Sequence, residues 1–489
     1  MSVVVVGNGM AGARFAVELR AREPRRPLVV FGAEPGRAYN RILLSNLLAG
    51  KADEQDLLLP EPQGAFDLRT GVEVVAVDPV AKTVVASDGS RTRFDVLVLA
   101  TGSRAVVPPI EGLWKDRSID SLVDGAETFR TLADCRRILA AAERARRAVV
   151  VGGGLLGIEA ARGLAKRGLE VEVVHARSHL MERQIDVEAS RILVETLAGL
   201  GVRVRLDAVT SEVVGTRRVE GIRLEDGTEI PADLLVIACG VRPNPDLAAA
   251  AGLTVNRGIV VDDEMRTSDP DIFAIGDCAE HRGTVYGLVA PAWEQARVAA
   301  EVISGVQGAR YEGSRLVTRL KAPGVELATM GDPSLVGDAT DSRTEVVTFA
   351  DPARRTYQKV MIRDRRLVAA ILLGDVPMVG ALTQIFDRQV PVPSDPRRLL
   401  FGHSMTGDRN EAAVDAMPAA MTLCRCNGVT AGAIARAWLA GARTAQEVAA
   451  RTHASTGCGS CRDLIEGYLD ALAADPNPAE EPVTEGVVA

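Results

Sequence analysis

The sequence predicts an α/β protein in which two parallel-sheet domains, one inserted in the other, precede an α+β domain and a small helical domain. Three observations carry this prediction. The apolar strands Val3–Val6 and Val149–Val151 each run into a glycine-rich turn and then a helix. The runs Leu97–Gly102 and Leu234–Gly240 share a second pattern, a buried strand that ends at a glycine. Four of the seven cysteines lie close to the carboxyl end.

Length and charge limit the possible classes of protein. A chain of 489 residues is long enough for roughly three or four domains, each with its own core. The net charge of -8 argues against nucleic acid or an anionic membrane surface as the main partner. No apolar run approaches the ~20 residues that span a bilayer, and the first residues lack the basic flank of a secretory signal. We therefore expect a cytoplasmic protein.

The first glycine turn has the residues of a dinucleotide-binding fingerprint. Gly7, Gly9 and Gly12 follow the first strand, and a helix over Ala11–Arg20 and a strand over Leu28–Phe31 are expected next. Glycines there permit a tight turn and the close approach of a pyrophosphate, which rests on the helix N-terminus. Glu34 follows at close to the ~20-residue spacing of a carboxylate that binds ribose hydroxyls. The alternative is a glycine turn that only packs helix on strand.

The second fingerprint, Gly152-x-Gly154-x-x-Gly157, differs at its acidic position. Its second strand ends in His175-Ala176-Arg177, without Asp or Glu. Arg177 lies where an arginine could meet a 2′-phosphate, so the residues themselves favour NADPH. We expect His175 to be a polar strand-end residue rather than a catalyst.

A carboxylate also follows the strand Ile272–Ile275. Asp277, in Ile275-Gly276-Asp277, could accept a hydrogen bond from a ribityl hydroxyl, and a plain surface turn is the alternative.

With these motifs in place, residues 1 to about 310 resemble the pyridine nucleotide-disulfide oxidoreductase superfamily. The likeness is carried by Gly7–Glu34, Ala100-Thr101-Gly102, Gly152–Glu159, Gly240-x-x-Pro243 and Thr267–Asp277. It implies FAD at the first fingerprint and NAD(P)H at the second. The implied FAD contacts are Gly7, Gly9, Met10, Ala11, Gly12, Glu34, Arg41, Ser45, Ala100, Thr101, Gly102, Gly276 and Asp277. The implied NAD(P)H contacts are Gly152, Gly154, Leu155, Leu156, Gly157, Glu159, His175, Arg177 and Gly240.

A narrower resemblance rests on Phe31–Glu34 and Tyr39–Ser45. These runs are similar to the flavoprotein part of NAD(P)H-dependent nitrite reductase large subunits and of assimilatory nitrate reductase electron-transfer subunits. By this likeness Arg41 flanks the flavin and Glu159 lies near the nicotinamide. The likeness favours NADH, whereas Arg177 favours NADPH. Of the two, we expect NADH.

A redox cysteine is missing beside the expected flavin. No cysteine lies between Gly12 and Cys135, and Ser45 and Asn46 occupy the place where one is expected. Thiol–disulfide exchange by the flavin domain is therefore excluded, and electrons must leave another way.

The exit is expected in the carboxyl-terminal cysteines. Cys424, Cys426, Cys458 and Cys461 offer four thiolates from two loops around a pair of helices, Thr430–Ala440 and Thr444–Arg451. Thr444 and Glu447 form the capping-box pattern of the second helix. Four thiolates can hold a [2Fe–2S] cluster, and a structural zinc is the alternative. The run Thr456–Cys461 resembles the bacterioferritin-associated-ferredoxin type of domain, which implies the cluster. Cys135, Cys239 and Cys278 are expected in the core.

The expected domain boundaries follow from these motifs. We expect an FAD-binding domain over 1–113 and 242–310, an NAD(P)H-binding domain over 114–241, an α+β interface domain over 311–400, a linker over 401–420, a [2Fe–2S] domain over 421–473 and a disordered tail over 474–489.

The motifs together predict an NAD(P)H-dependent FAD and iron–sulfur oxidoreductase. Hydride transfer delivers two electrons, and FAD can pass them singly to a cluster. The resemblance favours the electron-transfer subunit of an assimilatory nitrate reductase, which serves a separate molybdenum subunit, because too few cysteines remain for a sirohaem centre. The alternatives are a reductase for a nitrite reductase, a ferredoxin or an oxygenase, a subunit of an amino-acid or opine oxidase, and a redox sensor without turnover. No catalytic residue is assigned.

Overall fold

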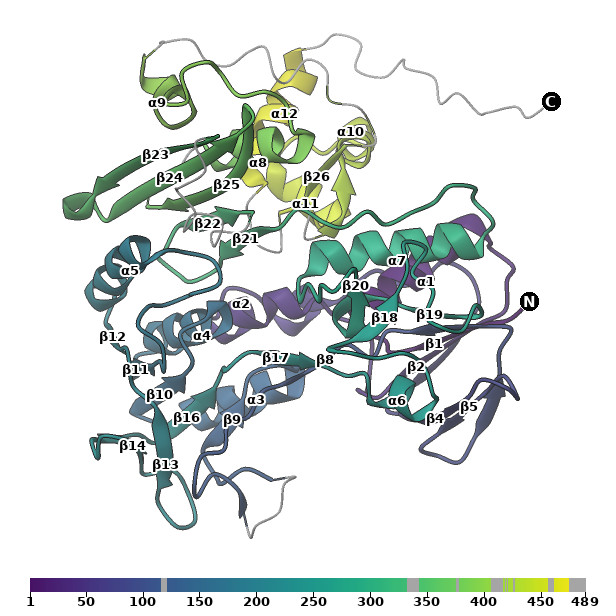
Figure 1. Ribbon diagram of the computed structural model, residues 1–489, viewed down its shortest axis with the longest axis horizontal. Helices are drawn as coiled ribbons and strands as arrows, with labels where there is room; N and C mark the ends of the chain where they lie inside the picture. Colours follow the sequence, from purple (N-terminus) through teal and green to yellow (C-terminus); the bar gives the residue numbers. More distant parts are fainter. Residues whose placement is uncertain are drawn as a thin grey trace. The chain divides into compact units, whose positions relative to one another are not determined.

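The computed structural model describes residues 1–115, 121–331, 343–374, 378–405, 417, 419, 421–424, 427–455 and 461–474. The chain divides into two compact units, Met1–Val376 and Pro377–Ala489 (Figure 1). Each unit is described by itself.

The first unit begins with a parallel sheet in the order β19-β7-β1-β2-β3. Its strands are β1 (Val3–Val6), β2 (Leu28–Gly32), β3 (Asp67–Thr70), β7 (Val96–Leu99) and β19 (Ile272–Ala274). The four valines of β1 are fully buried or nearly so, as expected for a parallel strand covered on both faces. Helices α1 (Met10–Arg22) and α7 (Val289–Ile303) pack against each other beside this sheet. Strands β7 and β19 are neighbours in this sheet although they lie far apart in the sequence. The segment between them therefore contains a domain inserted in the first one.

Smaller elements complete this domain. They are η1 (Arg41–Leu43), α2 (Leu44–Leu48), η2 (Glu54–Leu57), β4 (Val74–Asp78), β5 (Thr83–Ala86), β6 (Arg91–Arg93), α6 (Asp246–Ala250), β18 (Ile259–Val261), η4 (Gly276–Cys278) and β20 (Ala279–His281).

The inserted domain repeats the same plan with a parallel sheet in the order β12-β11-β10-β16-β9. Its strands are β9 (Ala126–Thr128), β10 (Arg147–Val151), β11 (Glu170–Val174), β12 (Val202–Arg205) and β16 (Leu234–Ile237). Its helices are α3 (Leu132–Ala142), α4 (Leu155–Lys166) and α5 (Val187–Gly199), and an antiparallel sheet adds β13 (Thr210–Val214), β14 (Gly221–Leu224) and β15 (Glu229–Pro231). The two passages between the domains pair as the antiparallel strands β8 (Ser103–Ala105) and β17 (Val241–Pro243).

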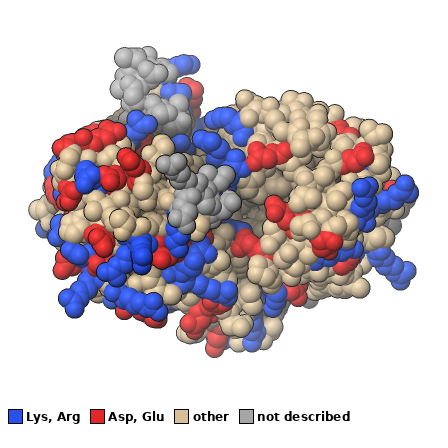
Figure 2. Space-filling model, turned by 90° about the horizontal axis from the view of Figure 1, so that it is seen from below, with Lys and Arg blue, Asp and Glu red and all other residues tan. Residues whose placement is uncertain are grey.

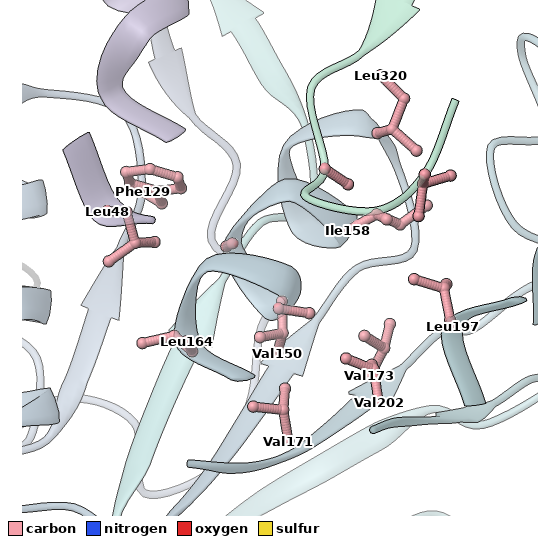
Figure 3. Close-up of a cluster of buried hydrophobic side chains, with 14 of the residues drawn as sticks. Leu48, Phe129, Val150, Ile158, Leu164, Val171, Val173, Leu197, Val202 and Leu320 are labelled. Carbon is pink, nitrogen blue, oxygen red and sulfur yellow. The ribbon is translucent and has the colours of Figure 1, made fainter. Parts of the chain in front are cut away.

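An antiparallel sheet in the order β21-β22-β25-β24-β23 ends the first unit. Its strands are β21 (Val317–Leu320), β22 (Leu327–Met330), β23 (Thr344–Asp351), β24 (Thr356–Arg363) and β25 (Arg366–Leu373), with η6 (Pro352–Arg354) between β23 and β24. Its core is continuous with that of the inserted domain. Figure 3 shows Leu320 of this sheet close to Ile158 of α4, with Leu48 of α2 on the other side of the same cluster.

The second unit is mainly helical. It contains α8 (Val379–Arg388), α9 (Arg398–Met405), α10 (Ala431–Leu439), α11 (Ala445–Thr452) and α12 (Arg462–Ala474), with a short pair of strands, β26 (Thr422–Cys424) and β27 (Val429–Thr430). The predicted capping box of α11 is confirmed: the Thr444 hydroxyl accepts a bond from the Glu447 N–H, and the Glu447 carboxylate accepts one from the Thr444 N–H.

The predicted fold class is confirmed by the two parallel sheets, the antiparallel sheet and the helical second unit. In the described ranges, no helix has the length and apolar character needed to cross a membrane. On the face shown in Figure 2, Lys and Arg side chains lie interspersed with Asp and Glu rather than forming one basic surface.

Candidate dinucleotide and cluster sites

The first glycine turn excludes side chains at two of its three glycines. A Cβ on Gly7, whose φ is +118°, would lie 2.1 Å from the carbonyl oxygen of Ala100. A Cβ on Gly12 would lie 1.9 Å from the carbonyl oxygen of Gly7. The turn therefore packs directly on the end of β7 and on the start of α1.

Gly9 differs because a Cβ there would meet no protein atom within 4 Å. Gly9 is the N-cap of α1, and no side chain caps the first N–H groups of this helix. Uncapped N–H groups at a helix start bind anions, and a glycine facing open space allows a ligand to approach the backbone. The N-terminus of α1, where Met10 and Ala11 lie, therefore fits a dinucleotide pyrophosphate.

Glu34, the expected ribose ligand, lies in a small polar cluster beyond β2. One of its carboxylate oxygens forms an ion pair with Arg41, and the other accepts a 2.7 Å hydrogen bond from the Tyr39 hydroxyl. The Leu132 N–H donates to the same hydroxyl over 2.9 Å. Burial raises the pKa of Tyr39 above its ordinary value, so the phenol stays a donor. Glu34 and Arg41 are thus held together as one charged pair at the predicted site.

Asp277 forms a second polar cluster with two residues that the sequence did not single out. Its Oδ2 accepts hydrogen bonds of 2.7 Å from Ser103 Oγ and 2.7 Å from Arg130 Nη2. The side chains of Arg130 and Asp277 are 22% and 17% exposed. Arg130 follows β9 of the inserted domain, and its carbonyl oxygen accepts a 3.2 Å bond from Arg41. Arg130 therefore links the two predicted FAD residues Arg41 and Asp277.

The turn that carries Asp277 is fixed against the start of α1. Gly276 has φ +79°, and its N–H donates to the buried Gln295 side chain over 2.8 Å. A Cβ on Gly276 would lie 2.8 Å from Cβ of Ala11. The indole of Trp293, also on α7, donates to the Met10 carbonyl oxygen over 3.2 Å. Helix α7 thus brings the Asp277 turn and the first glycine turn together.

The remaining predicted FAD residues have structural contacts of their own. The Thr101 hydroxyl donates to the Asn244 carbonyl oxygen over 2.7 Å, and the Asn244 backbone N–H donates to the Gly102 carbonyl oxygen over 2.9 Å. Ser45 is 1% exposed, and its hydroxyl lies 3.4 Å from the Ile42 carbonyl oxygen. Contacts of Ser45, Thr101 and Gly102 with the flavin stay predictions.

The second glycine turn reproduces the geometry of the first. A Cβ on Gly152, whose φ is +117°, would lie 2.3 Å from the Ala238 carbonyl oxygen, and one on Gly157 would lie 1.9 Å from that of Gly152. A Cβ on Gly154 would again meet no protein atom within 4 Å. Gly154 is the N-cap of α4, whose first residues are Leu155 and Leu156, and no side chain caps it. This turn therefore fits a second pyrophosphate.

His175 supports this second turn. Its Nδ1 accepts a 3.0 Å hydrogen bond from the Gly153 N–H, and the Gly153 carbonyl oxygen accepts a 3.0 Å bond from Met181. A Cβ on Gly153 would lie 2.7 Å from Cγ of His175. The sequence-based view of His175 as a polar strand-end residue agrees with this position, and its contact with NAD(P)H stays a prediction.

Glu159 on α4 is held by a lysine that the sequence left without a role. One oxygen of Glu159 accepts bonds from Lys321 Nζ at 2.7 Å and from the Lys321 N–H at 2.9 Å. The two side chains are 3% and 13% exposed. One turn along α4, Arg162 donates to the Pro323 carbonyl oxygen over 2.9 Å. These bonds hold the β21–β22 loop on α4, and the expected place of Glu159 near the nicotinamide stays a prediction.

The three single cysteines are poor candidates for redox chemistry. Burial raises the pKa of Cys135 to about 12 and that of Cys239 to about 11, and it also raises the pKa of Cys278. Because the thiolate is the reactive form, these thiols are inert at neutral pH. Cys239 precedes Gly240, whose φ of +96° marks the turn at the end of β16.

Two of the four expected cluster ligands lie in described parts of the second unit. Cys424 ends β26 and is fully buried, and Cys461 precedes α12 and is 4% exposed. The Ser455 N–H lies 3.4 Å from the Cys424 sulfur, as a donor to it. Cys426 and Cys458 lie outside the described residues. Buried sulfurs with an N–H donor suit a thiolate-bound cluster and equally a zinc ion, so the donor set alone does not choose between them.

Comparison with family models resolves this choice and identifies the parts of the chain. Residues 1–301 match the family described as pyridine nucleotide-disulphide oxidoreductase. Residues 317–389 match the rubredoxin NAD+ reductase C-terminal domain, and residues 422–471 match the BFD-like [2Fe-2S] binding domain.

Curated relatives align with almost the whole chain. Nitrite reductase [NAD(P)H] of Bacillus subtilis (strain 168) is 40% identical over 96% of this chain and 57% of its own length. The assimilatory nitrate reductase electron transfer subunit of the same organism is 36% identical over 96% of this chain and 59% of its own length. The nitrite reductase (NADH) large subunit of Escherichia coli (strain K12) is 34% identical over 96% of this chain and 55% of its own length. The chain thus spans little more than half the length of these relatives.

Solved structures show the same fold. The NAD-dependent persulfide reductase from A. fulgidus superposes with a TM-score of 0.72 at 26% identity, over 80% of this chain and 77% of that one. The ferredoxin reductase for the CYP199A2 system from Rhodopseudomonas palustris superposes with a TM-score of 0.71 at 27% identity, over 82% of this chain and 97% of that one. The chain belongs to the pyridine nucleotide-disulphide oxidoreductase family, as an NAD(P)H-dependent flavin oxidoreductase that carries a [2Fe–2S] domain.

Proposed function

We propose that this chain is the electron-supplying part of an assimilatory nitrate reductase and delivers electrons from NAD(P)H, through FAD and a [2Fe–2S] cluster, to a separate molybdenum catalytic subunit. The observation that carries the proposal is the alignment of 96% of the chain with an assimilatory nitrate reductase electron transfer subunit. That alignment runs from the dinucleotide turns to the cluster domain.

The chain's own residues support this order of carriers. Two glycine turns of matching geometry offer two pyrophosphate sites, and FAD at the first supplies the step between hydride and single-electron transfer. The cysteines outside the cluster domain have raised pKa values and stay protonated. A dithiol exit from the flavin domain is therefore absent among the described residues, and Cys424 and Cys461 belong to the alternative exit.

A sirohaem nitrite reductase unit is the second candidate acceptor. The identity to a nitrite reductase is 40%, against 36% for the nitrate reductase subunit, and this difference favours the second candidate. Both candidates require the same carriers, so they differ only in the protein that receives the electrons.

The test is anaerobic electron delivery by the FAD- and cluster-loaded protein. The purified catalytic subunit of an assimilatory nitrate reductase, a sirohaem nitrite reductase and ferricyanide are offered as acceptors. The proposal expects reduction of the first, and reduction of the nitrite reductase alone would select the second candidate. Reduction of ferricyanide but of neither enzyme would overturn both candidate functions. If ferricyanide is not reduced either, the protein would be a redox sensor without turnover.

A pair of cysteine variants makes the test specific for the cluster. Cys424→Ala removes a buried thiol of the cluster domain and should stop delivery to the enzyme acceptor while NAD(P)H still bleaches the flavin. Cys135→Ala removes an equally buried thiol on α3, far along the chain from that domain, and should leave delivery intact. Loss of flavin bleaching in a folded, FAD-loaded Cys424→Ala protein would show that the order of carriers is wrong.

A further inference from the structure

We propose that Asn427 is a positioning residue for the [2Fe–2S] cluster. Its side-chain amide holds the turn after α11, so that the Ser455 N–H stays directed at the Cys424 sulfur and raises the reduction potential of the cluster. The inference rests on the proposed function only in that Cys424 must be a ligand of the cluster. Two contacts between the Cys424 loop and this turn carry it.

The first contact comes from the loop that follows Cys424. Cys424 pairs with Val429 where β26 and β27 meet, and Asn427 lies half-buried between these two residues. The side-chain Nδ2 of Asn427 donates a hydrogen bond to the His453 carbonyl oxygen. His453 is the C-cap of α11. Asn427 therefore joins the loop that carries Cys424 to the end of α11.

The second contact is made two residues further along the turn. The Ser455 N–H is directed at the Cys424 sulfur over 3.4 Å. Between the two contacts, Ala454 is fully buried, and its N–H donates to the Thr452 hydroxyl over 3.2 Å. Because Ala454 alone separates His453 from Ser455, a shift of the His453 carbonyl would also move the Ser455 N–H.

The backbone of the turn is in a disfavoured conformation at both contacts. His453 has φ +58° and Ser455 has φ +62°. Residues other than glycine are uncommon in this left-handed region and stay there only where their surroundings hold them. The His453 N–H donates to the Ala449 carbonyl oxygen over 2.8 Å, which fixes the side of His453 towards the helix. Asn427 holds the carbonyl that leads on to Ser455.

The direction of the Ser455 N–H gives the sign of its effect on the cluster. An N–H directed at a sulfur stabilises negative charge there, and reduction adds one negative charge. The reduced state therefore gains more than the oxidised state, and the potential rises; hydrogen bonds to the sulfurs are among the factors that set it. Because Cys424 is fully buried, water does not readily supply another donor when the turn moves away.

A redox titration followed by electron paramagnetic resonance measures the midpoint potential of the cluster in the full-length, FAD-loaded protein. At a fixed potential, Asn427→Ala should lower the ratio of reduced to oxidised cluster several-fold. Since only the difference between two charge states counts, we expect roughly tenfold at most, which is about 59 mV for one electron. Gln446→Ala removes an exposed amide on α11 and should keep the wild-type potential. An unchanged potential in Asn427→Ala, or an equal shift in Gln446→Ala, would overturn the inference.

A glycine background separates positioning from a general structural role. Glycine adopts the left-handed region without a steric cost. His453→Gly with Ser455→Gly should therefore form the turn without help from Asn427, and adding Asn427→Ala should then shift the potential little. The full shift in this background would overturn the inference. If the single variant Asn427→Ala does not retain its cluster, the triple variant should retain it, and failure to do so would also overturn the inference.

Reduction by the nucleotides separates this inference from the proposed function. A wild-type cluster that dithionite reduces and neither NADPH nor NADH reduces would refute the proposed function. A lowered potential in Asn427→Ala would still support the inference in that case. A wild-type potential in Asn427→Ala, together with electron delivery by the wild type, would refute the inference alone. Absence of a cluster from the wild-type protein would refute both.

Discussion

Gly9→Ala should abolish FAD binding while leaving the folded protein intact, because the structure gives Gly9 no neighbour of its own. A Cβ there meets no protein atom within 4 Å, and the backbone, at φ −85° and ψ −168°, is allowed for alanine. The empty space lies at the uncapped start of α1, where the pyrophosphate is expected. The methyl group would therefore occupy the ligand's place and no other.

The expected change in stability is the difference of two small effects. Alanine is a poorer N-cap than glycine, by about 0.5 to 1 kcal/mol. Replacing glycine also restricts the unfolded chain, which stabilises the fold by about 0.4 to 1 kcal/mol. The free energy of unfolding of the apoprotein should thus stay within about 1 kcal/mol of the wild type.

Gly12→Ala is the matched comparison, with the opposite outcome. Its Cβ would lie 1.9 Å from the Gly7 carbonyl oxygen, which is backbone and cannot swing away. Overpacking of this kind costs about 1 to 3 kcal/mol or more. Urea unfolding of both apoproteins and FAD titration followed by absorbance measure the two effects separately. Normal FAD affinity in Gly9→Ala, or wild-type stability in Gly12→Ala, would refute the reading of this turn.

Three further predictions follow from other contacts. Gly154→Ala should keep its FAD and raise the KM for the nicotinamide, because its Cβ faces only open space in the second turn; unchanged KM would contradict this. Lys321→Met should lower the free energy of unfolding, measured with urea, by roughly 3 to 5 kcal/mol, because Glu159 is left buried without its cation. The double variant Lys321→Met with Glu159→Gln should recover much of this lost stability. Arg282 and His281 lower the pKa of Asp263 to about 2, so its contribution to stability is present above about pH 4 and is lost as the pH falls towards 2. Asp263→Asn should therefore lose less stability than the wild type between pH 5 and pH 2, and equal losses would rule out this cause.

The sequence predicted the parts of the site that depend on local pattern. Glycine spacing after an apolar strand requires particular backbone geometry, so Gly7, Gly12, Gly152 and Gly157 could be placed without a structure. The same reasoning identified Asp277 from the strand before it.

The sequence could not predict the partners that come from distant segments. Arg130 meets Asp277, and Lys321 meets Glu159, across more than a hundred residues in each case. Neither lies in a motif, because a single arginine or lysine on a loop has no pattern of its own. Glu34 and Arg41 were both predicted, but their ion pair depends on how η1 folds back towards β2.

Electron paramagnetic resonance of the anaerobically purified, FAD-loaded protein tests most directly whether electrons leave the flavin through the carboxyl-terminal thiolates. The spectrum is recorded after addition of NADPH and, separately, of NADH. We expect the signal of a reduced [2Fe–2S] cluster with at least one of the two nucleotides, accompanied by acid-labile sulfide and absent in Cys424→Ala. Bound zinc without sulfide, or a cluster that dithionite reduces and neither nucleotide does, would contradict it.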